Sequence, residues 1–212
     1  MRVYRFLDAQ FGLKSLYERR LKISRIEDLN DPFEFLPFDL THDIMRNHIE
    51  SVKANAHSSQ GLLCFSSSWS NPLIWAHYSD RHKGLCLGFE IPYGDSVIYK
   101  AKPIQMALDD SIEETRRLIK DYKNTKYSGW CYEDEVRVWK KLEDQESLCF
   151  ADFGDELRLS EVIAGMACPI TEAELVRAIA DPSVKIVKAR RAFDEFKIVE
   201  DENGFAKAAM YP

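Results

Sequence analysis

The sequence lacks several features that would assign a function directly. It has no run of 18 apolar residues, so we expect no membrane span. The residues that follow Met1 form no apolar stretch, so we expect no secretory signal peptide. It has no surplus of positive charge: 35 acidic side chains against 29 basic ones give a net charge of −6, which argues against general nucleic-acid binding. It also contains no glycine-rich phosphate loop and no Gly-x-Ser-x-Gly nucleophile elbow.

Cysteine and histidine are present but are not spaced for metal chemistry. The five cysteines form no Cys-x-x-Cys pair, which argues against a zinc ribbon or a redox motif. Cys64 and Cys86 lie inside apolar stretches, where a reduced thiol packs as a small hydrophobe, so we expect a cytoplasmic protein. His77 and His82 would lie about 140° apart on a helix, so they share no ligand face and we expect no metal.

The composition is that of an ordinary globular protein. Apolar residues make up 45% of the chain and charged residues 30%. There is no internal repeat, no low-complexity segment and no linker rich in Gly, Pro or Ser, so we predict a single domain over residues 1–212. Helical and strand patterns alternate irregularly, which indicates an α+β fold with mixed, mostly antiparallel β-sheets and flanking helices.

Hydrophobic periodicity and turn residues place the expected elements. Asn71 and the Thr171/Glu174 pair predict helix starts, and Gly84 is a candidate left-handed stop for the helix after Asn71. Asn-Asp-Pro at 30–32 predicts a loop over 28–35. We expect helices at 9–18, 41–56, 72–80, 109–123 and 171–180, and strands at 3–7, 21–24, 62–65, 85–91, 97–99, 131–140, 159–167, 184–189 and 196–199.

A short basic cluster lies near the C-terminal end of the chain. Its members are Lys185, Lys188, Arg190 and Arg191, and they alternate with valine and isoleucine. This alternation predicts the solvated face of a strand and not a track for phosphates. A local pocket for a small phosphorylated ligand remains compatible with the acidic net charge.

The segment from Tyr132 to Trp139 is the strongest candidate for chemistry. On a strand, Glu133, Glu135 and Arg137 would share one face, because side chains alternate. Two neighbouring carboxylates raise each other's proton affinity unless a cation offsets them. The face is therefore either solvated, with Arg137 screening the pair, or a carboxylate pair beside a ligand.

Two further segments carry polar groups at strand positions. The apolar strand at 62–65 runs into Ser66, Ser67 and Ser68, whose hydroxyls either orient a neighbouring carboxylate or satisfy a turn. On the first strand, Arg5 lies between two aromatic residues. Its guanidinium either binds a phosphate or stays in water while its stem covers apolar surface.

The chain resembles a bacterial family known as domain of unknown function 2971, whose name assigns no activity. The resemblance rests on four blocks that occur in family order along most of the chain. These blocks are Leu29-Asn30-Asp31-Pro32-Phe33-Glu34, Cys64-Phe65-Ser66, the segment 75–90 (Trp-Ala-His-Tyr-Ser-Asp-Arg-His-Lys-Gly-Leu-Cys-Leu-Gly-Phe-Glu), and Tyr132-Glu133-Asp134-Glu135-Val136-Arg137.

A second resemblance, to ADP-ribosyltransferases, is more distant. It rests on an Arg on the first strand, a Ser-rich strand end and a Glu-x-Glu strand, in that order. It implies a split-sandwich fold, NAD as substrate, and transfer of ADP-ribose to an acceptor that the sequence does not identify. The sequence departs from the family pattern in two ways: the serine run lacks the Thr of Ser-Thr-Ser, and Arg5 lies almost at the first residue.

This second resemblance implies a role for each candidate residue. Glu135, oriented by Ser66, would stabilise positive charge on the ribose as the nicotinamide bond breaks, much as in glycoside hydrolysis. Glu133 would position or deprotonate the acceptor. The residues implied in NAD binding are Arg5 at the pyrophosphate, one of Tyr4, Tyr132 or Trp69 against the nicotinamide ring, and Ser68 and His77.

Two alternatives from other classes stay open at this point. The first is a non-catalytic domain that binds a phosphorylated small molecule or a partner protein, with Trp69, Trp75 and Tyr78 as the core and rim of one patch and Glu133 and Glu135 at the surface. The second is a metal-dependent phosphodiesterase that uses Glu133, Glu135 and Asp80, which would require a hard divalent cation.

Overall fold

The computed structural model of the chain describes residues 1–105, 122–142 and 148–207. The chain divides into two compact units, and each unit is assembled from segments that are far apart in the sequence. Unit 1 contains Met1–Leu21, Phe65–Tyr93 and Phe150–Pro212, and unit 2 contains Lys22–Cys64 and Gly94–Cys149. That residues 1–212 form a single domain stays a prediction.

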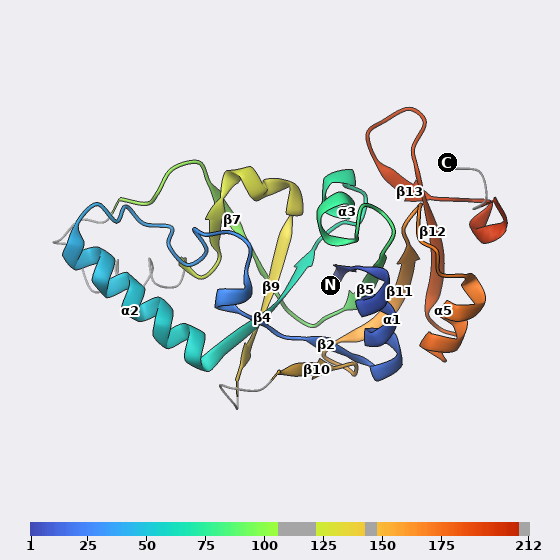
Figure 1. The fold of residues 1–212 in the computed structure, drawn as a ribbon, viewed down its shortest axis with the longest axis horizontal. Coiled ribbons are helices and arrows are strands. Elements are labelled where there is room, and N and C mark those ends of the chain that lie inside the picture. Colours follow the sequence, from blue (N-terminus) through green and yellow to red (C-terminus); the bar gives the residue numbers. More distant parts are fainter. Residues whose placement is uncertain (106–121, 143–147, 208–212) are drawn as a thin grey trace. The chain divides into compact units, whose positions relative to one another are not determined.

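Unit 1 is built on a mostly antiparallel sheet (Figure 1). Its strands follow the order β13-β12-β11-β5-β1, and the last residue of the next strand, Ser66, pairs with Tyr4. The β11–β12 pair is parallel, and the chain between these two strands forms a helix, as a parallel connection requires. The strands are β1 (Arg2–Leu7), β5 (Leu85–Glu90), β11 (Arg158–Ala164), β12 (Lys185–Arg191) and β13 (Ile198–Glu200).

The helices of unit 1 begin where the sequence provides caps. Helix α1 (Ala9–Glu18) begins after Asp8, whose carboxylate accepts the Phe11 N–H at 2.8 Å. Helix α3 (Pro72–Tyr78) begins after Asn71, and α5 (Glu172–Ile179) begins with the predicted Thr171/Glu174 capping box. A short 3-10 helix, η3 (Gly204–Lys207), follows the last strand.

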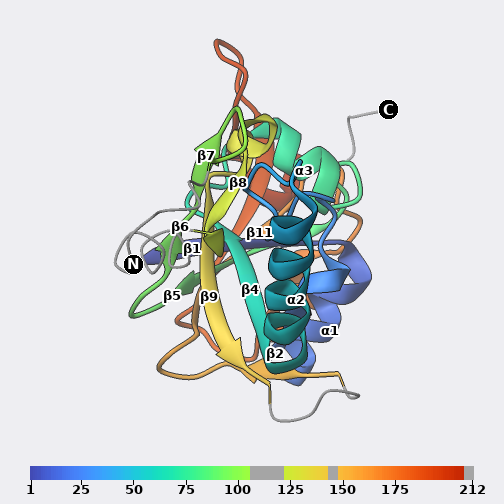
Figure 2. The ribbon, with the colours of Figure 1, turned by 90° about the vertical axis from the view of Figure 1, so that its left-hand side faces the viewer.

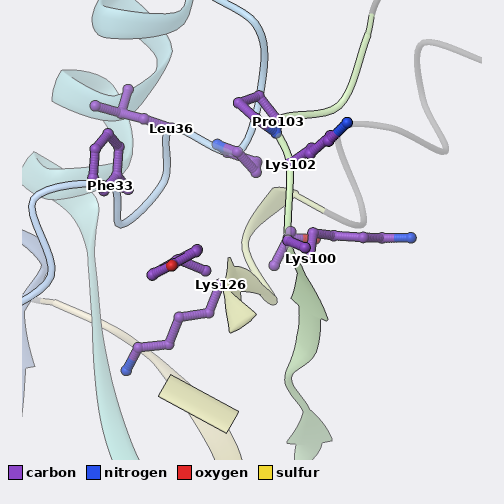
Figure 3. A pocket seen from close by; sticks show the side chains of 10 residues that line it. Phe33, Leu36, Lys100, Lys102, Pro103 and Lys126 are labelled. Carbon is purple, nitrogen blue, oxygen red and sulfur yellow. The ribbon is translucent and has the colours of Figure 1, made fainter. Parts of the chain in front are cut away.

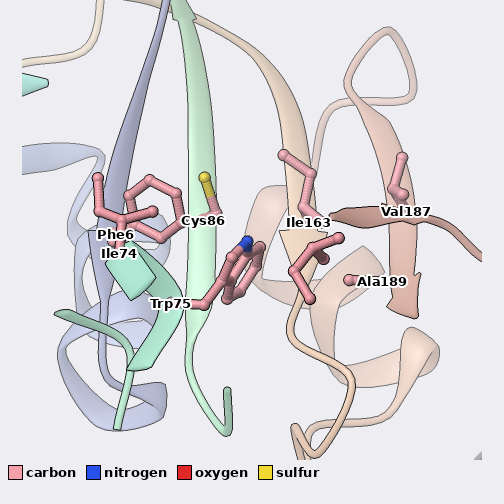
Figure 4. Packing of buried hydrophobic residues seen from close by; sticks show 8 residues of the cluster. Phe6, Ile74, Trp75, Cys86, Ile163, Val187 and Ala189 are labelled. Atoms are coloured by element: carbon pink, nitrogen blue, oxygen red, sulfur yellow. The ribbon is translucent and has the colours of Figure 1, made fainter. Parts of the chain in front are cut away.

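The core of unit 1 forms where α3 packs on the sheet (Figure 4). Trp75 of α3 is fully buried against β5, beside Cys86, and its ring meets the edge of Phe6 at a centroid distance of 5.0 Å. Its indole N–H donates to the Trp69 carbonyl at 2.6 Å, so the one polar atom of this side chain is satisfied. The other members of the cluster are Ile74, Ile163, Val187, Ala189 and Ile198.

Unit 2 contains short strands and one long helix (Figure 2). Helix α2 (Asp43–Ser59) runs beside β4 (Gln60–Ser66), and Ile49, Ala56 and Leu62 belong to one apolar cluster around the fully buried Phe35. Strand β4 pairs with β3 (Ser24–Arg25) and β9 (Glu135–Lys141), β9 pairs with β6 (Asp95–Ser96), and β7 (Ile98–Lys100) pairs in parallel with β8 (Thr125–Tyr127). The 3-10 helices η1 (Ile26–Asp28) and η2 (Ser128–Glu133) complete the unit.

One further strand pair involves the chain segment that leads from unit 1 into unit 2. Strand β2 (Arg20–Lys22) pairs with β10 (Phe150–Asp152). In unit 1, the Arg20 guanidinium lies 3.8 Å from the centre of the Phe150 ring. This close cation–π contact adds to the stability of the two short paired strands.

The α+β class and the mostly antiparallel pairing are confirmed. The helices expected at 9–18, 41–56, 72–80 and 171–180 are present with ends within a few residues, and 28–35 lacks regular structure after η1. The helix expected at 109–123 lies almost wholly outside the described residues. The strand expected at 97–99 is present one residue later, as β7 (Ile98–Lys100), and the two-residue strand β6 that precedes it was not expected. No helix within the described ranges has the length and apolar character to cross a membrane.

The prediction of Gly84 as a left-handed helix stop is wrong. The left-handed backbone falls on Asp80, Arg81 and His82, with φ angles of 43°, 54° and 68°. Three such residues without glycine store strain, and the segment is held because His82 stacks on Trp75 at 6.2 Å between ring centres. Gly84 is required for a different reason: a Cβ there would lie 2.0 Å from the Leu7 carbonyl oxygen.

The solvated-face prediction for the basic cluster is wrong at Lys188. Its ammonium is buried, and it donates to the carbonyls of Gly165 and Cys168 at 2.8 and 3.2 Å. Strand β12 is an interior strand between β11 and β13, so its middle is covered while its two ends, Lys185 and Arg191, stay exposed.

We expect Gly84→Ala to destabilise the protein by about 2 kcal/mol or more, because the new methyl group would meet backbone that cannot rotate away. Urea unfolding measures this directly. Gly154→Ala is the matched control, since a Cβ at Gly154 meets nothing within 4 Å and should change stability by less than about 0.5 kcal/mol. Equal shifts in the two variants would contradict this explanation.

Candidate functional site

A buried cluster of five charged side chains lies in unit 2. Its members, which we call the ion cluster, are 6% exposed or less: Glu34, Lys126, Glu133, Glu135 and Arg137. The Lys126 ammonium donates to Glu133 Oε2 at 2.5 Å and to Glu135 Oε2 at 3.0 Å, and it lies 3.4 Å from Glu34 Oε1. The cluster therefore holds three carboxylates around two cations.

Arg137 connects the remaining groups of the ion cluster. Its Nε donates to Glu135 Oε1 at 2.9 Å, and its Nη2 donates to Glu34 Oε1 at 2.7 Å. The Nη1 donates to the Lys123 carbonyl at 2.7 Å. The planar guanidinium has N–H groups that point toward all of these acceptors at once. A lysine ammonium in its place would be a single point charge.

Local backbone structure brings the two neighbouring acids to the same lysine. The prediction of one strand over 131–140 is wrong: residues up to Glu133 form η2, Asp134 is left-handed at φ 45°, and the strand begins at Glu135. Asp tolerates this conformation better than most residues, so the turn forms here. Glu133 thus does not share a strand face with Glu135 and Arg137, yet both carboxylates still reach Lys126.

The pKa values of two carboxylates in the ion cluster are shifted in opposite directions. Burial opposes ionisation of Glu135, but Arg137 and Lys126 overcome it and lower the pKa to about 2. For Glu34 burial is the larger effect, and its pKa is raised despite the same two cations. Burial also works against the charge on Lys126, yet its three acidic neighbours raise its pKa. Glu135 is therefore the firmly ionised acid of the cluster.

A cavity of about 420 Å³ opens beside the ion cluster (Figure 3). Its walls are mostly apolar, with Phe33 and Leu36 on one side and Pro103 on the other. The aliphatic part of the Lys126 side chain lines the cavity. Its ammonium points away from the cavity and donates to the Glu133 carboxylate. The full lining is Phe33, Leu36, Pro37, Lys100, Ala101, Lys102, Pro103, Thr125, Lys126 and Tyr127.

The predicted site residues divide between the two units. Glu133, Glu135 and Tyr132 belong to unit 2, where the Tyr132 and Trp130 rings lie 6.0 Å apart. Tyr4, Arg5, Ser66, Ser68, Trp69 and His77 belong to unit 1. That the two groups serve one reaction stays a prediction.

In unit 1 the serine hydroxyls bond within their own loop. Ser66 Oγ donates to the Ser68 carbonyl at 2.7 Å, and Ser68 Oγ lies 2.9 Å from Ser70 Oγ. The backbone N–H groups of Ser68 and Ser70 donate back to the hydroxyls two residues earlier. The hydroxyls thus satisfy a turn, one of the two interpretations of this segment.

The other unit 1 candidates lie on or against the sheet. Arg5 is half-buried on β1, opposite Leu87, and its neighbour Tyr4 pairs with Ser66. Trp69 and Tyr4 both pack against the core cluster around Trp75. His77 lies on α3 with its ring against Tyr78, at 6.4 Å between ring centres.

Sequence reasoning missed two members of the ion cluster, Lys126 and Glu34. Glu34 ends the block Leu29–Glu34 and Arg137 ends the block Tyr132–Arg137, and the structure brings these two block ends within 2.7 Å. Lys126 stands in a short strand with no distinctive neighbours. The sequence offers one sign of a further buried cation: Glu133 and Glu135 together carry more negative charge than Arg137 alone neutralises.

Within the described part of the chain, no group of three or more His, Cys, Asp and Glu side chains is arranged to hold a metal ion. Comparison of the chain with family models, with curated proteins and with solved structures finds no match. Both family resemblances therefore stay predictions.

We expect acid to destabilise the protein partly through Glu135. Its folded-state pKa of about 2 lies below the ordinary value, so its contribution, on the order of 3 kcal/mol, is present above about pH 4.5 and is lost as the pH falls toward 2. Glu34, with its raised pKa, acts in the opposite direction between its ordinary and its raised value. Glu135→Gln should therefore be less stable at pH 7 and lose less stability between pH 5 and 3.

Urea unfolding at a series of pH values checks this prediction. Glu90→Gln is a suitable control, because Glu90 pairs with the half-exposed Arg2 and an exposed pair contributes under about 1 kcal/mol. Parallel pH profiles for wild type and Glu135→Gln would contradict the role given to Glu135.

Proposed function

We propose that unit 2 binds a small nucleotide-like anion, with the apolar part of the ligand in the cavity and its phosphates at Lys100 and Lys102. The cavity carries this proposal. Its volume of about 420 Å³ is in the range of sites for small organic ligands, and its walls are mostly apolar with a few charged groups at the edge.

The charge of the cavity supports an anion. Lys100 and Lys102 are exposed at its edge, their ammonium groups extend away from Phe33 and Leu36, and neither forms an ion pair with any residue that the structure describes (Figure 3). Lys126 is different, because its three acidic neighbours already use its charge. The two edge lysines are therefore the phosphate contacts, and Lys126 contributes only its stem.

The aromatic residues of the cavity support a flat ring on the ligand. Phe33 is 63% exposed and Tyr127 is 53% exposed, although both are large apolar side chains. Aromatic side chains left open at a cavity offer stacking surface for a nucleobase. A nucleotide joins such a ring to phosphates, which matches the two kinds of surface available here.

The ion cluster supports the site without contacting the ligand's charge. Phe33 is the neighbour of Glu34 in the chain, and Lys126 belongs to both the cluster and the cavity wall. Side chains fixed by several charge-assisted hydrogen bonds hold their geometry, and a pre-formed wall reduces the ordering cost of binding.

We expect ADP and NAD to bind the protein with saturable heat in calorimetry, and Lys100→Glu/Lys102→Glu to weaken both by at least about tenfold. Each lost charge-assisted contact corresponds to on the order of 1.5 kcal/mol, and 1.4 kcal/mol is a factor of ten. Adenosine, which has no phosphate, should bind more weakly to wild type and should be insensitive to the lysine changes.

Lys83→Glu is the matched control, since Lys83 is an exposed lysine of unit 1 and should leave binding unchanged. Phe33→Ser should weaken ADP and adenosine to a similar extent, because it removes a surface that the ring would use. Undetectable binding of both nucleotides to wild type would overturn the proposal.

A second candidate function is ADP-ribosyl transfer from NAD. Two observations favour it: the Arg5 strand pairs directly with the strand that ends in Ser66, with Tyr4 opposite Ser66, and Glu135 has a pKa of about 2 and is thus ionised as a catalytic carboxylate must be. On this hypothesis Arg5 binds the pyrophosphate, Glu135 stabilises the developing charge on the ribose, and the fold is of the split-sandwich type. The 4% exposure of Glu135 requires that it release a partner to reach substrate.

Nicotinamide release from NAD tests this candidate separately from binding. We expect wild type to release nicotinamide faster than the no-enzyme rate, and Arg5→Ala and Glu135→Gln each to lower that rate by at least about a hundredfold, as loss of a transition-state contact does. Glu90→Gln should keep the wild-type rate. Binding of NAD by wild type without any release would leave the binding function standing and reject the transferase.

A further inference from the structure

The loop between β12 and β13 carries two phenylalanines at its tip. We call residues 193–196, Phe-Asp-Glu-Phe, the hairpin tip. Strands β12 and β13 pair antiparallel, and below the tip the Ala192 N–H donates to the Lys197 carbonyl at 2.8 Å, so the base of the loop is closed. The loop extends beyond the ends of the two strands (Figure 1). All residues of the hairpin tip are exposed, so their side chains are open to contact with another molecule.

Both phenylalanines of the hairpin tip lie open to solvent. Phe196 is 99% exposed, the highest value for a large apolar side chain in the described ranges, and Phe193 is 81% exposed. The Arg190 guanidinium covers one face of Phe193, at 4.8 Å from the ring centre. Exposed apolar surface that is concentrated in one place marks a contact site for another molecule. Phe196 is therefore the side chain that a partner would bury.

The charges of the hairpin tip indicate what kind of partner it fits. Asp194 and Glu195 lie between the two phenylalanines. Glu195 pairs with Lys197 at 2.7 Å, whereas Asp194 forms no ion pair with any residue that the structure describes. The partner must therefore combine an apolar pocket with positive charge at its edge. An anionic membrane surface fits poorly, because it would repel the acids beside the aromatic rings.

The cavity of unit 2 has this combination (Figure 3). Phe33, Leu36 and Pro103 form apolar walls, and the exposed Lys100 and Lys102 lie at the edge without an ion pair in the described part of the chain. Its volume of about 420 Å³ is in the range of pockets that bind an aromatic group. Opposite charges on two surfaces favour one partner over others. The hairpin tip and the cavity are complementary in both polarity and charge.

We propose that the hairpin tip of one copy of the chain binds in the unit 2 cavity of a second copy. The Phe196 ring lies against Phe33 and Leu36, and the Asp194 carboxylate lies beside the ammonium groups of Lys100 and Lys102. The two surfaces of the contact are different, so the copies associate head-to-tail.

The contact occupies the cavity in which we place the nucleotide. Self-association and ADP binding are therefore expected to exclude each other. This competition rests on the proposed function, whereas the association itself does not, because it uses only the hairpin tip, the apolar walls and the two edge lysines.

Sedimentation velocity of the full chain measures the association. Aromatic side chains bury on the order of 150–250 Å² each, so the interface is small, the association is weak, and concentrations up to about 0.5 mM are needed. We expect the average mass of wild type to rise with concentration. Phe193→Ser/Phe196→Ser and Lys100→Glu/Lys102→Glu should each weaken the association by at least about tenfold, as loss of an interface anchor does. Phe11→Ser, which changes an exposed phenylalanine of α1, is the control and should leave the association unchanged.

Mixing the two variants separates this contact from any other. The tip variant, Phe193→Ser/Phe196→Ser, keeps its cavity, and the cavity variant, Lys100→Glu/Lys102→Glu, keeps its hairpin tip. Each should sediment as a monomer alone, and the mixture should form a 1:1 dimer through the one contact that remains.

Exchanging the charges tests the position of the acids. Adding Asp194→Lys/Glu195→Lys to the cavity variant should restore self-association, whereas the same two changes in the wild-type chain should weaken it. Thermal melting of each variant verifies that it is folded.

Four outcomes would overturn the proposal. These are a wild type that stays monomeric at every concentration, a tip variant that associates as well as wild type, a mixture without the 1:1 dimer, and binding of the hairpin tip to phosphatidylserine vesicles in place of self-association. ADP that binds in calorimetry and leaves the association unchanged would also overturn it, because the hairpin tip would then lie outside the cavity. Failure of ADP to bind would reject the nucleotide proposal alone, and the mixture would still decide the association.

Discussion

The guanidinium of Arg137 is the constraint on which unit 2 depends. It is completely removed from water, it cannot lose its proton, and it must therefore keep acceptors on several sides. Those acceptors come from the loop at Glu34, from Glu135 on the same strand and from the carbonyl of Lys123. Because all three segments hydrogen-bond to the same guanidinium, their positions are fixed relative to one another. The cavity wall formed by Phe33 and Lys126 is fixed with them.

Much of the fold was predictable because local signals and burial agree. Asp8, Asn71 and Thr171 each cap a helix within one turn of sequence, and continuous apolar runs mark β4 and β5. The errors occur where tertiary contacts override local pattern. A lysine such as Lys188 is expected at the surface. Its strand is interior, however, and two backbone carbonyls replace water around its ammonium.

The candidate site was predictable only in part, for a related reason. The Glu133/Glu135/Arg137 segment can be recognised from the sequence, because two acids and a base lie close together in the chain. Its partners Glu34 and Lys126 are brought in by the fold, and no spacing rule connects a residue at position 34 with one at position 137.

The interleaving of the two units has a consequence for how the chain folds as it is made. Strand β1 needs β5, which is synthesised about eighty residues later, and β5 in turn needs β11, which follows after a further seventy or so. Unit 2 is complete once Cys149 has emerged, whereas the sheet of unit 1 still lacks its last three strands. The first strand therefore has no neighbour along most of its length until Glu90 has been made, and the other edge of β5 then stays unpaired until β11 follows.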